Sequence, residues 1–433
     1  LRSPQKRFLK IIDLRDDVSK TARARRGFFL GVSRPEDHVM HASTILHRSL
    51  SAVLESMHAG RRRVLLQAVD ALVSGRRLTL TDLARSWPDA VWMHAPLKAL
   101  DRLLSNAHLA QEVQPLHREM AHWLLRGPQP CILVDWTDLK GNAHGCVLRA
   151  AVPTGGRALT LYEQVYPIQQ LSQPRVQRAF LKTLKSLLPP TVKPIIVTDA
   201  GFRSDWCRAV AQMGWHYVAR IRNNTQVCAG NSKAWVPCTS LFAVAGNSPK
   251  DLGAFDVVKR DPMRSRLVLS PSKSSRTQTS PPKIRLRAKR ARKGAMEPWL
   301  LATSLSTADS TAAQVLSIYR RRMQIEEAFR DLKSHRYGAG FEDSLTRKPN
   351  RITILLLLQT LAAFAAWIAG CAGTQANLAD PMTRQISRRS SYSTVRRGYA
   401  WIRLGALMIQ HLLAWLRSPF ESNQSPGYAG IMA

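Results

Sequence analysis

Two aspartates and one glutamate are the residues whose positions most suggest chemistry. Asp135 ends the apolar run 131–134, Asp199 ends the run 194–198 in the same manner, and Glu326 lies in a polar helical segment. Carboxylates at the ends of buried strands are poorly solvated, so like charges that meet there need a compensating cation. Each aspartate alone could equally be a turn or cap residue. The three together predict an oxygen-rich site suited to Mg²⁺, for which Mn²⁺ can substitute.

Basic and aromatic side chains accompany the glutamate. On a continuous helix at 100° per residue, four side chains fall within an arc of about 60°: Tyr319, Arg322, Glu326 and Lys333. The arc borders the apolar stripe of the same helix, as expected at the rim of a cleft. For this helix alone, a solvated face with an Arg322–Glu326 pair is the alternative. Beside two aspartates, the arc favours metal-assisted attack on a phosphodiester.

Hydrophobic periodicity predicts the elements that position these residues. Strands are expected at 131–135, 146–152, 159–165, 194–198, 215–222 and 299–303, and helices at 176–188, 205–213 and 312–335. This order indicates an α/β fold with a layered sheet, compatible with a ribonuclease-H-like catalytic core. Short strands at 255–258 and 266–269 indicate a β-rich insertion. The insertion carries a basic loop, 259–293, with 13 basic residues.

The charge balance indicates the class of partner. The chain has 433 residues, with 64 Lys and Arg against 29 Asp and Glu, a net charge of +35. A hydrophobic content of 45% excludes wholesale disorder. Because basic side chains are rarely buried, the excess should face solvent and favours nucleic acid over an acidic protein or a membrane. The six cysteines form no C-x-x-C pair, so neither a structural zinc nor a disulfide framework is expected.

Six segments are predicted along the chain. They are a disordered or non-native leader (1–40), an α-helical DNA-binding domain (41–128), the first part of the core (129–222), the β-rich basic insertion (223–298), the second part of the core (299–373) and a helical C-terminal region (374–433). Short helices at 80–87 and 94–104 fit a helix-turn-helix, although a plain helical bundle is as plausible.

One apolar stretch, 354–372, is long enough to cross a bilayer. Gln359 interrupts it and Ala is abundant, so a helix buried in a large core is the simpler interpretation. No charged-then-apolar leader opens the sequence, which favours a cytoplasmic location, and no small-molecule substrate is indicated.

The pattern Y-x2-R-x3-E-x6-K, met by Tyr319, Arg322, Glu326 and Lys333, resembles the signature of the insertion-sequence-four family of bacterial transposases. The likeness includes residues 134–138, 198–202 and 393–396, and extends from about residue 40 to beyond residue 398. It implies a ribonuclease-H-like DDE core interrupted by a β-rich insertion. It also implies Mg²⁺-dependent cut-and-paste transposition by a dimer acting on paired double-stranded DNA ends and a target.

The resemblance also assigns roles to residues. It implies that Asp135, Asp199 and Glu326 are catalytic and hold the metal, and that Tyr319, Arg322 and Lys333 contact phosphates near the cleaved end. Trp299 matches the position at which the family stacks a flipped base during hairpin formation, although an ordinary buried strand tryptophan is as plausible.

Two other functions remain open from the sequence. The first is a non-catalytic nucleic-acid-binding protein, in which the same cations bind phosphate and the acids are structural. The second is a ribonuclease-H-like nuclease that cuts DNA without joining it. Metal-dependent cleavage distinguishes the first from a transposase, and strand transfer distinguishes the second.

Overall fold

The computed structural model describes residues 40–139, 145–230, 232–272, 297–380, 382, 392–405 and 407–417. All of them belong to one compact unit, Val39–Ala433. Residues 1–39 of the leader predicted at 1–40, residues 273–296 of the basic loop and the last sixteen residues, 418–433, lie outside the described residues.

Among the described residues, a ten-stranded mixed sheet organises the α/β part of the chain, in the order β3-β2-β1-β4-β5-β10-β9-β8-β6-β7. Its strands are β1 (Cys131–Asp138), β2 (Cys146–Pro153), β3 (Ala158–Tyr166), β4 (Ile195–Thr198), β5 (His216–Ile221), β6 (Gln226–Ala229), β7 (Val236–Pro237), β8 (Lys250–Val257), β9 (Met263–Leu269) and β10 (Leu300–Thr303). The β1–β4 and β4–β5 pairs are parallel. The described ladders on either side of them are antiparallel.

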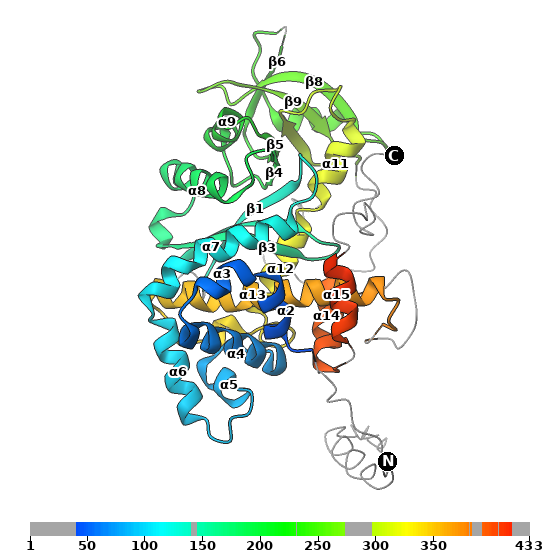
Figure 1. Cartoon of the computed structure of the whole chain (residues 1–433). Helices are drawn as coiled ribbons and strands as arrows, with labels where there is room; N and C mark the ends of the chain where they lie inside the picture. Colours follow the sequence, from blue (N-terminus) through cyan, green and yellow to red (C-terminus); the bar gives the residue numbers. More distant parts are fainter. Residues whose placement is uncertain are drawn as a thin grey trace, which may run out of the picture. The chain divides into compact units, whose positions relative to one another are not determined.

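Helices cover both faces of this sheet (Figure 1). Alternate residues of a strand point to opposite faces, so Ile132 and Val134 pack with α8 (Pro174–Leu187) and α9 (Ser204–Gln212). Leu133 points the other way and packs with α11 (Ala312–Arg320) and α12 (Met323–Lys333). Asp135 has the same strand parity as Leu133, so its side chain is expected on the α11–α12 face.

The remaining helices gather around one long helix, α13. They are α2 (Ala42–Ser49), α3 (Ser51–Ser56), α4 (Ala59–Gly75), α5 (Leu80–Arg85), α6 (His94–Leu104), α7 (Ala107–Leu124), α13 (Pro349–Gln375), α14 (Thr394–Arg403) and α15 (Ile409–Arg417), with 3₁₀ turns at Ile168–Gln170, Cys238–Val244 and Phe341–Asp343. Helix α13 packs against α2, α4, α6 and α7 from one end of the chain and α14 and α15 from the other. Figure 1 shows these helices on either side of it.

Helix α13 contains the apolar stretch 354–372, which the sequence allowed to be either a membrane span or a buried core helix. It is the one helix among the described residues long and apolar enough to cross a membrane, with a mean hydropathy of 2.1. Within the protein, 83% of its apolar window is buried. The interpretation as a core helix is confirmed.

Most predicted elements agree with the structure to within a few residues, and two do not. Strand β1 continues three residues past Asp135, so this aspartate lies within the strand and not at its end. The single helix predicted over 312–335 is wrong, because it breaks at Arg321–Arg322. Through the break the backbone bonds run from residue i to i−3, such as Arg322 N–H to the Tyr319 carbonyl, which tightens the turn. The common 60° arc calculated for an unbroken helix therefore does not hold.

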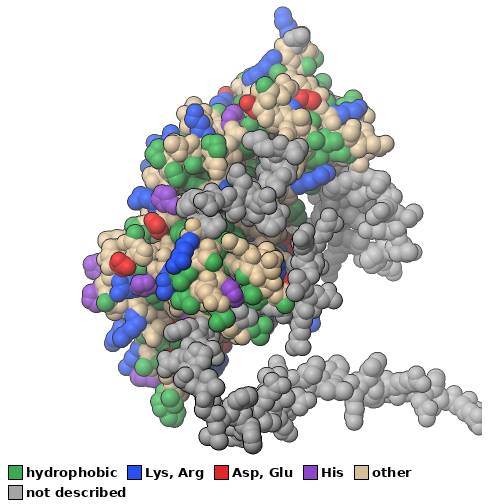
Figure 2. Space-filling view, turned by 45° about the vertical axis from the view of Figure 1, so that its right-hand side comes forward, with side chains coloured by type: hydrophobic (Ala, Val, Ile, Leu, Met, Phe, Trp, Pro, Cys, Tyr) green, Lys and Arg blue, Asp and Glu red, His purple; other side chains and the backbone are tan. Residues whose placement is uncertain are grey.

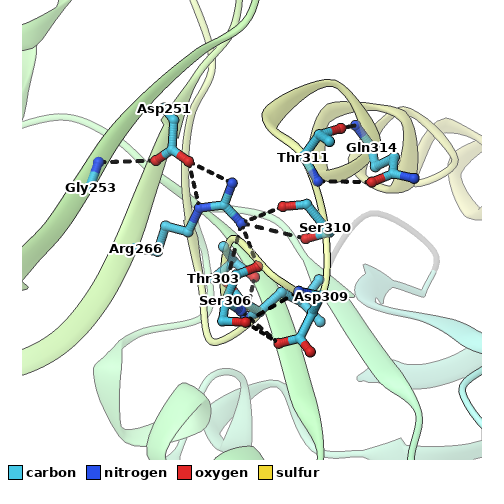
Figure 3. A network of polar contacts seen from close by, with 10 residues as sticks. Asp251, Gly253, Arg266, Thr303, Ser306, Asp309, Ser310, Thr311 and Gln314 are labelled. Atoms are coloured by element: carbon cyan, nitrogen blue, oxygen red, sulfur yellow. Dashed lines mark hydrogen bonds and ion pairs between the residues drawn. The ribbon is translucent and has the colours of Figure 1, made fainter.

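The predicted β-rich insertion joins the main sheet through β9 and β10. Arg266 of β9 holds it to the loop before α11 (Figure 3). Its guanidinium donates from Nε and Nη2 to Asp251 Oδ2, and from Nη1 to the carbonyl oxygens of Leu305, Ser306 and Ser310. The same loop ends at Thr311, whose side chain forms a capping box with Gln314. The insertion thus fixes the start of the helix that carries Tyr319.

Part of the basic excess lies on the one face of the protein that Figure 2 draws. In Figure 2, Lys and Arg side chains are spread over the face of the protein, with few Asp and Glu side chains between them.

Candidate active site

The two aspartates lie side by side on the α11–α12 face of the sheet. The parallel register pairs Leu133 of β1 with Val197 of β4. Side chains two residues apart on a strand point to the same face, so Asp135 and Asp199 point to the same face as Leu133 and Val197 and lie next to each other. Asp199 comes directly after β4, as predicted, and its Oδ1 accepts a hydrogen bond from the Gly201 N–H at 2.9 Å.

Helix α12 brings Glu326 to the first aspartate through Arg322. The Arg322 guanidinium donates from Nη1 to Asp135 Oδ2 at 3.2 Å and from Nη2 to Glu326 Oε1. Arg322 is 13% exposed, and its Nε is buried without a hydrogen-bond partner among the described residues. A single cation therefore bridges two of the three predicted catalytic carboxylates.

The surroundings of Asp135 perturb its carboxyl group strongly. Burial raises its pKa to about 7, and the negative charge of Asp199 adds to the effect, while Arg322 opposes it. Glu326 also raises this pKa, so both other carboxylates act electrostatically on Asp135. One guanidinium does not neutralise such a group, and a second cation would stabilise it.

A ready-made metal cage is not present. Among the described residues, no three His, Cys, Asp or Glu side chains converge closely enough to hold a metal ion. The donor set nevertheless fits a hard divalent cation, because all three groups are carboxylates and Arg322 already occupies the position between two of them. A cation that binds the same two oxygens would compete with Arg322 for them.

The predicted phosphate-binding residues have different surroundings: Lys333 is in an ion pair, and Tyr319 is buried against Trp299. Lys333 is near the site, but its Nζ lies 2.9 Å from Asp138 Oδ1. Tyr319 is only 2% exposed, and its ring packs edge-on against Trp299 with 5.1 Å between centroids. Trp299 is half-buried, and its backbone N–H donates to Ser270 Oγ at 2.7 Å. The structure thus brings Tyr319, Trp299 and Arg322 together, with the Arg322 guanidinium carbon 5.9 Å from the Tyr319 ring centre.

Arg220 is a site residue that the sequence reading missed. Val197 pairs with Val218 of β5, so the row of Asp135 and Asp199 continues to Arg220 on the next strand. Burial lowers its pKa, and Tyr319, Arg322 and Glu297 are among the charged or polar groups that act on it. Its Nε is buried without a partner among the described residues. The strand parity of Arg220 was readable in the sequence, but the register that aligns it with Asp199 was not.

Comparison with protein families now identifies the chain. The family model described as the transposase DDE domain matches residues 126–365, which is more than half of the chain. The chain belongs to the transposase DDE domain family. As a DDE transposase it is an enzyme of DNA transposition, and the matched segment contains Asp135, Asp199 and Glu326.

Two further comparisons were made for this DDE transposase. Curated protein sequences give no match. Among solved structures, it is similar to the piggyBac transposase synaptic complex with hairpin DNA, with a TM-score of 0.40 and 11% sequence identity over 91% of this chain and 88% of that chain.

For this DDE transposase, Arg220→Gln is expected to slow the first DNA nick by about 100-fold, the usual cost of losing one donor that stabilises developing charge. Its guanidinium has no ion-pair partner among the described residues, so it is available to a DNA phosphate. Single-turnover nicking of end DNA measures the effect. Arg222→Gln is the matched control, because Arg222 Nε already lies 3.4 Å from Glu297. Equal losses in both variants would contradict the assignment.

Proposed function

We propose that this transposase cuts the ends of an insertion sequence and joins the freed 3′ ends to target DNA, within the insertion-sequence-four branch of DDE transposases. The observation that carries the proposal is the bridge from Asp135 through Arg322 to Glu326, beside Asp199. It combines an electrostatically coupled carboxylate set with a cation that suits a phosphate.

The order of the strands supports a ribonuclease-H-like core. Strands β3, β2 and β1 are antiparallel neighbours, and β1, β4 and β5 follow in parallel. Helix α8 connects β3 to β4, and helix α9 connects β4 to the parallel β5. In the proposed layout, β6 to β9 form the β-rich insertion before the segment with Glu326, and the boundaries near 128, 222, 298 and 373 stay predictions.

Asp135, Asp199 and Glu326 are the proposed ligands of a divalent cation, Mg²⁺ with Mn²⁺ as a substitute. When bound, such a cation activates water or a 3′-hydroxyl and stabilises the leaving oxygen of a phosphodiester. The residues themselves have separate tasks. The carboxylates hold their negative charge at one edge of the sheet, and Arg322 is released from Asp135 and Glu326 to meet the DNA backbone.

The cations beside the triad are proposed to grip the cleaved end. Lys333 would exchange Asp138 for a phosphate in the same way as Arg322 exchanges its carboxylates. Tyr319, which lies against both Arg322 and Trp299, would join them at the phosphate next to the cut. A base flipped out during hairpin formation would stack on the half-buried Trp299.

The N-terminal helices have a surface suited to double-stranded DNA. The turn between α5 and α6 exposes two apolar side chains, Val91 at 85% and Trp92 at 80%. Lys98 and Arg102, four residues apart, are exposed on the same side of α6. Apolar groups just before the second helix and cations along it are what a helix-turn-helix needs to contact bases and phosphates, so we propose that this region binds the terminal inverted repeats.

Joining pre-cut DNA ends to a second duplex tests the proposed function. With Mg²⁺, the protein is expected to convert end DNA carrying a free 3′-hydroxyl into strand-transfer products, because nicking and joining are the same in-line displacement at phosphorus. Nicking without joining would favour a nuclease, and binding without either reaction would favour a non-catalytic protein. Two transposase copies acting on paired ends, in the cytoplasm, complete the proposal.

A further inference from the structure

Helix α12 has a second polar face, opposite the catalytic one. At 100° per residue, Asp331 lies about 20° from Gln324 on the helix, whereas Glu326 lies about 200° from it. Glu327 falls on the side of Gln324 and Asp331. The residues of this rear face all contact other parts of the chain, and their partners there, Thr154, Gly156 and Arg157, lie outside the predicted triad.

Gln324 fixes the first turn of α12 to the hairpin that joins β2 and β3. Its Oε1 accepts hydrogen bonds from the backbone N–H groups of Thr154 and Gly156, both at 3.1 Å. Two amides on one side-chain oxygen define its position more closely than a single bond would. The turn is itself closed by a 2.7 Å bond from Thr154 N–H to the Arg157 carbonyl.

Asp331 fixes the helix two turns later to the same hairpin. Arg157 donates to both of its carboxylate oxygens, from Nε to Oδ2 and from Nη2 to Oδ1 at 3.4 Å. Arg157 is only 15% exposed, and its Nη2 lies 3.9 Å from Glu327. Such bidentate pairs constrain orientation as well as distance.

A second cation reaches Asp331 from α14. Arg396 Nη2 lies 3.3 Å from Asp331 Oδ1. Helix α14 is seated closely on α13, because a Cβ on Gly398 would come within 1.6 Å of the Ala366 carbonyl oxygen. The rear face of α12 is therefore held by two elements that have little freedom to move.

The β2–β3 hairpin is hydrogen-bonded to β1, the strand that carries Asp135. Strand β2 pairs with β1, and the residue directly opposite Asp135 is Arg149. The β2–β3 turn holds α12 at Gln324 and Asp331, so the position of the helix is fixed relative to the strands around Asp135. Rotation of α12 about its axis would move Glu326 away from Asp135 and break the rear contacts at the same time.

We infer that Gln324, with Arg157 and Asp331, is a positioning residue: the Thr154–Arg157 turn holds α12 from behind and sets the direction in which Glu326 points. The inference rests on the proposed function, in which Glu326 acts together with Asp135. Misplacing a reacting group by about 1 Å can cost about 100-fold in rate. The direction of Glu326 therefore affects the rate, although none of the three positioning residues belongs to the triad.

A pair of variants at one position tests the inference. Gln324→Leu removes the acceptor, whereas Gln324→Glu keeps an oxygen for the same two amides. Arg330→Ala is the matched control on α12, since Arg330 is 66% exposed and bonds only Glu327 among the described residues. Asp331→Asn is the second route if Gln324→Leu folds poorly. The full-length protein is assayed for single-turnover nicking, affinity for end DNA, Mn²⁺ affinity and thermal unfolding.

Gln324→Leu is expected to lower the nicking rate and the Mn²⁺ affinity by about 10- to 100-fold, the usual effect of losing an outer contact to a metal-binding group. Affinity for end DNA should stay within about 2-fold, and Gln324→Glu and Arg330→Ala should behave like the wild type. Wild-type nicking and Mn²⁺ affinity in Gln324→Leu, or equal losses in Gln324→Glu, would overturn the inference. A wild-type protein that binds Mn²⁺ but nicks no end DNA would instead overturn the proposed function.

Discussion

Asp199→Asn is expected to reduce DNA nicking and strand transfer by about 10³-fold or more, the scale on which residues that act as a unit lose activity. The substitution is informative because it removes only charge. An asparagine Oδ1 can still accept the 2.9 Å bond from the Gly201 N–H, so the loop after β4 keeps its conformation. Glu326→Gln should have the same effect for the same reason, since its amide oxygen can still accept from Arg322.

Controls separate loss of chemistry from loss of fold or binding. Asp205→Asn changes an exposed acid six residues away, in the first turn of α9, and should retain full activity. Glu327→Gln should lose less than about 10-fold, because Glu327 points away from Asp135 and contributes only a 3.9 Å contact with Arg157 to the rear face. Gel-shift affinity for end DNA should be unchanged in all four variants. Full activity in Asp199→Asn, or a Glu327→Gln variant as inactive as Glu326→Gln, would show that the triad is assigned incorrectly.

Residues that follow from local pattern were predictable from the sequence. Asp199 lies where an apolar strand of four residues ends, and this position needs only the run 195–198 to be recognised. The long buried helix was predictable for the same reason, because its apolar residues are consecutive. In both cases the signal lies within one element, so no knowledge of its neighbours is required.

The break between α11 and α12 was not predictable in this way. Arg321 and Arg322 are good helix formers, and nothing in their propensity ends a helix. The break comes from a change to i→i−3 bonding at the point where Tyr319 enters the core and Arg322 reaches across to Asp135. Such a tertiary contact links residues 187 positions apart, and periodicity carries no information about it.

Register and partner choice account for the other residues that were missed. Arg220 joins the row of aspartates only through the β4–β5 alignment, and Arg157 meets Asp331 across 174 residues. A sequence gives the parity of a strand, but a shift of one residue in pairing would place Arg220 beside a different neighbour. The charged residues of α12 were recognised, whereas their division into a catalytic face and a rear face depends on the partners around the helix.

Arg149→Met is expected to lower the free energy of unfolding by about 3–5 kcal/mol, because it leaves the Glu163 carboxylate buried without its cation. Arg149 and Glu163 are cross-strand neighbours on β2 and β3, and both side chains are only 4% exposed. Arg149 donates to Glu163 Oε2 from Nε at 2.8 Å and from Nη2 at 2.6 Å, and Thr360 of α13 donates to Oε1 at 3.0 Å. The pair therefore joins the sheet to the central helix.

The double variant Arg149→Met with Glu163→Leu decides whether the loss comes from the unpaired charge. Replacing both members of a buried pair by apolar groups is often nearly neutral, so the double variant should recover most of the stability lost by the single one. Urea unfolding of the metal-free protein measures both, and Arg264→Met, from a pair that is 53% exposed on the arginine side, should cost less than about 1 kcal/mol. A double variant no more stable than Arg149→Met would mean that Arg149 stabilises the fold mainly through its 4.8 Å contact with the Phe329 ring of α12. Arg149 lies directly opposite Asp135, the first of the proposed catalytic residues. Nicking rates at a temperature where each variant is fully folded would therefore show how far the Arg149–Glu163 pair supports the proposed site.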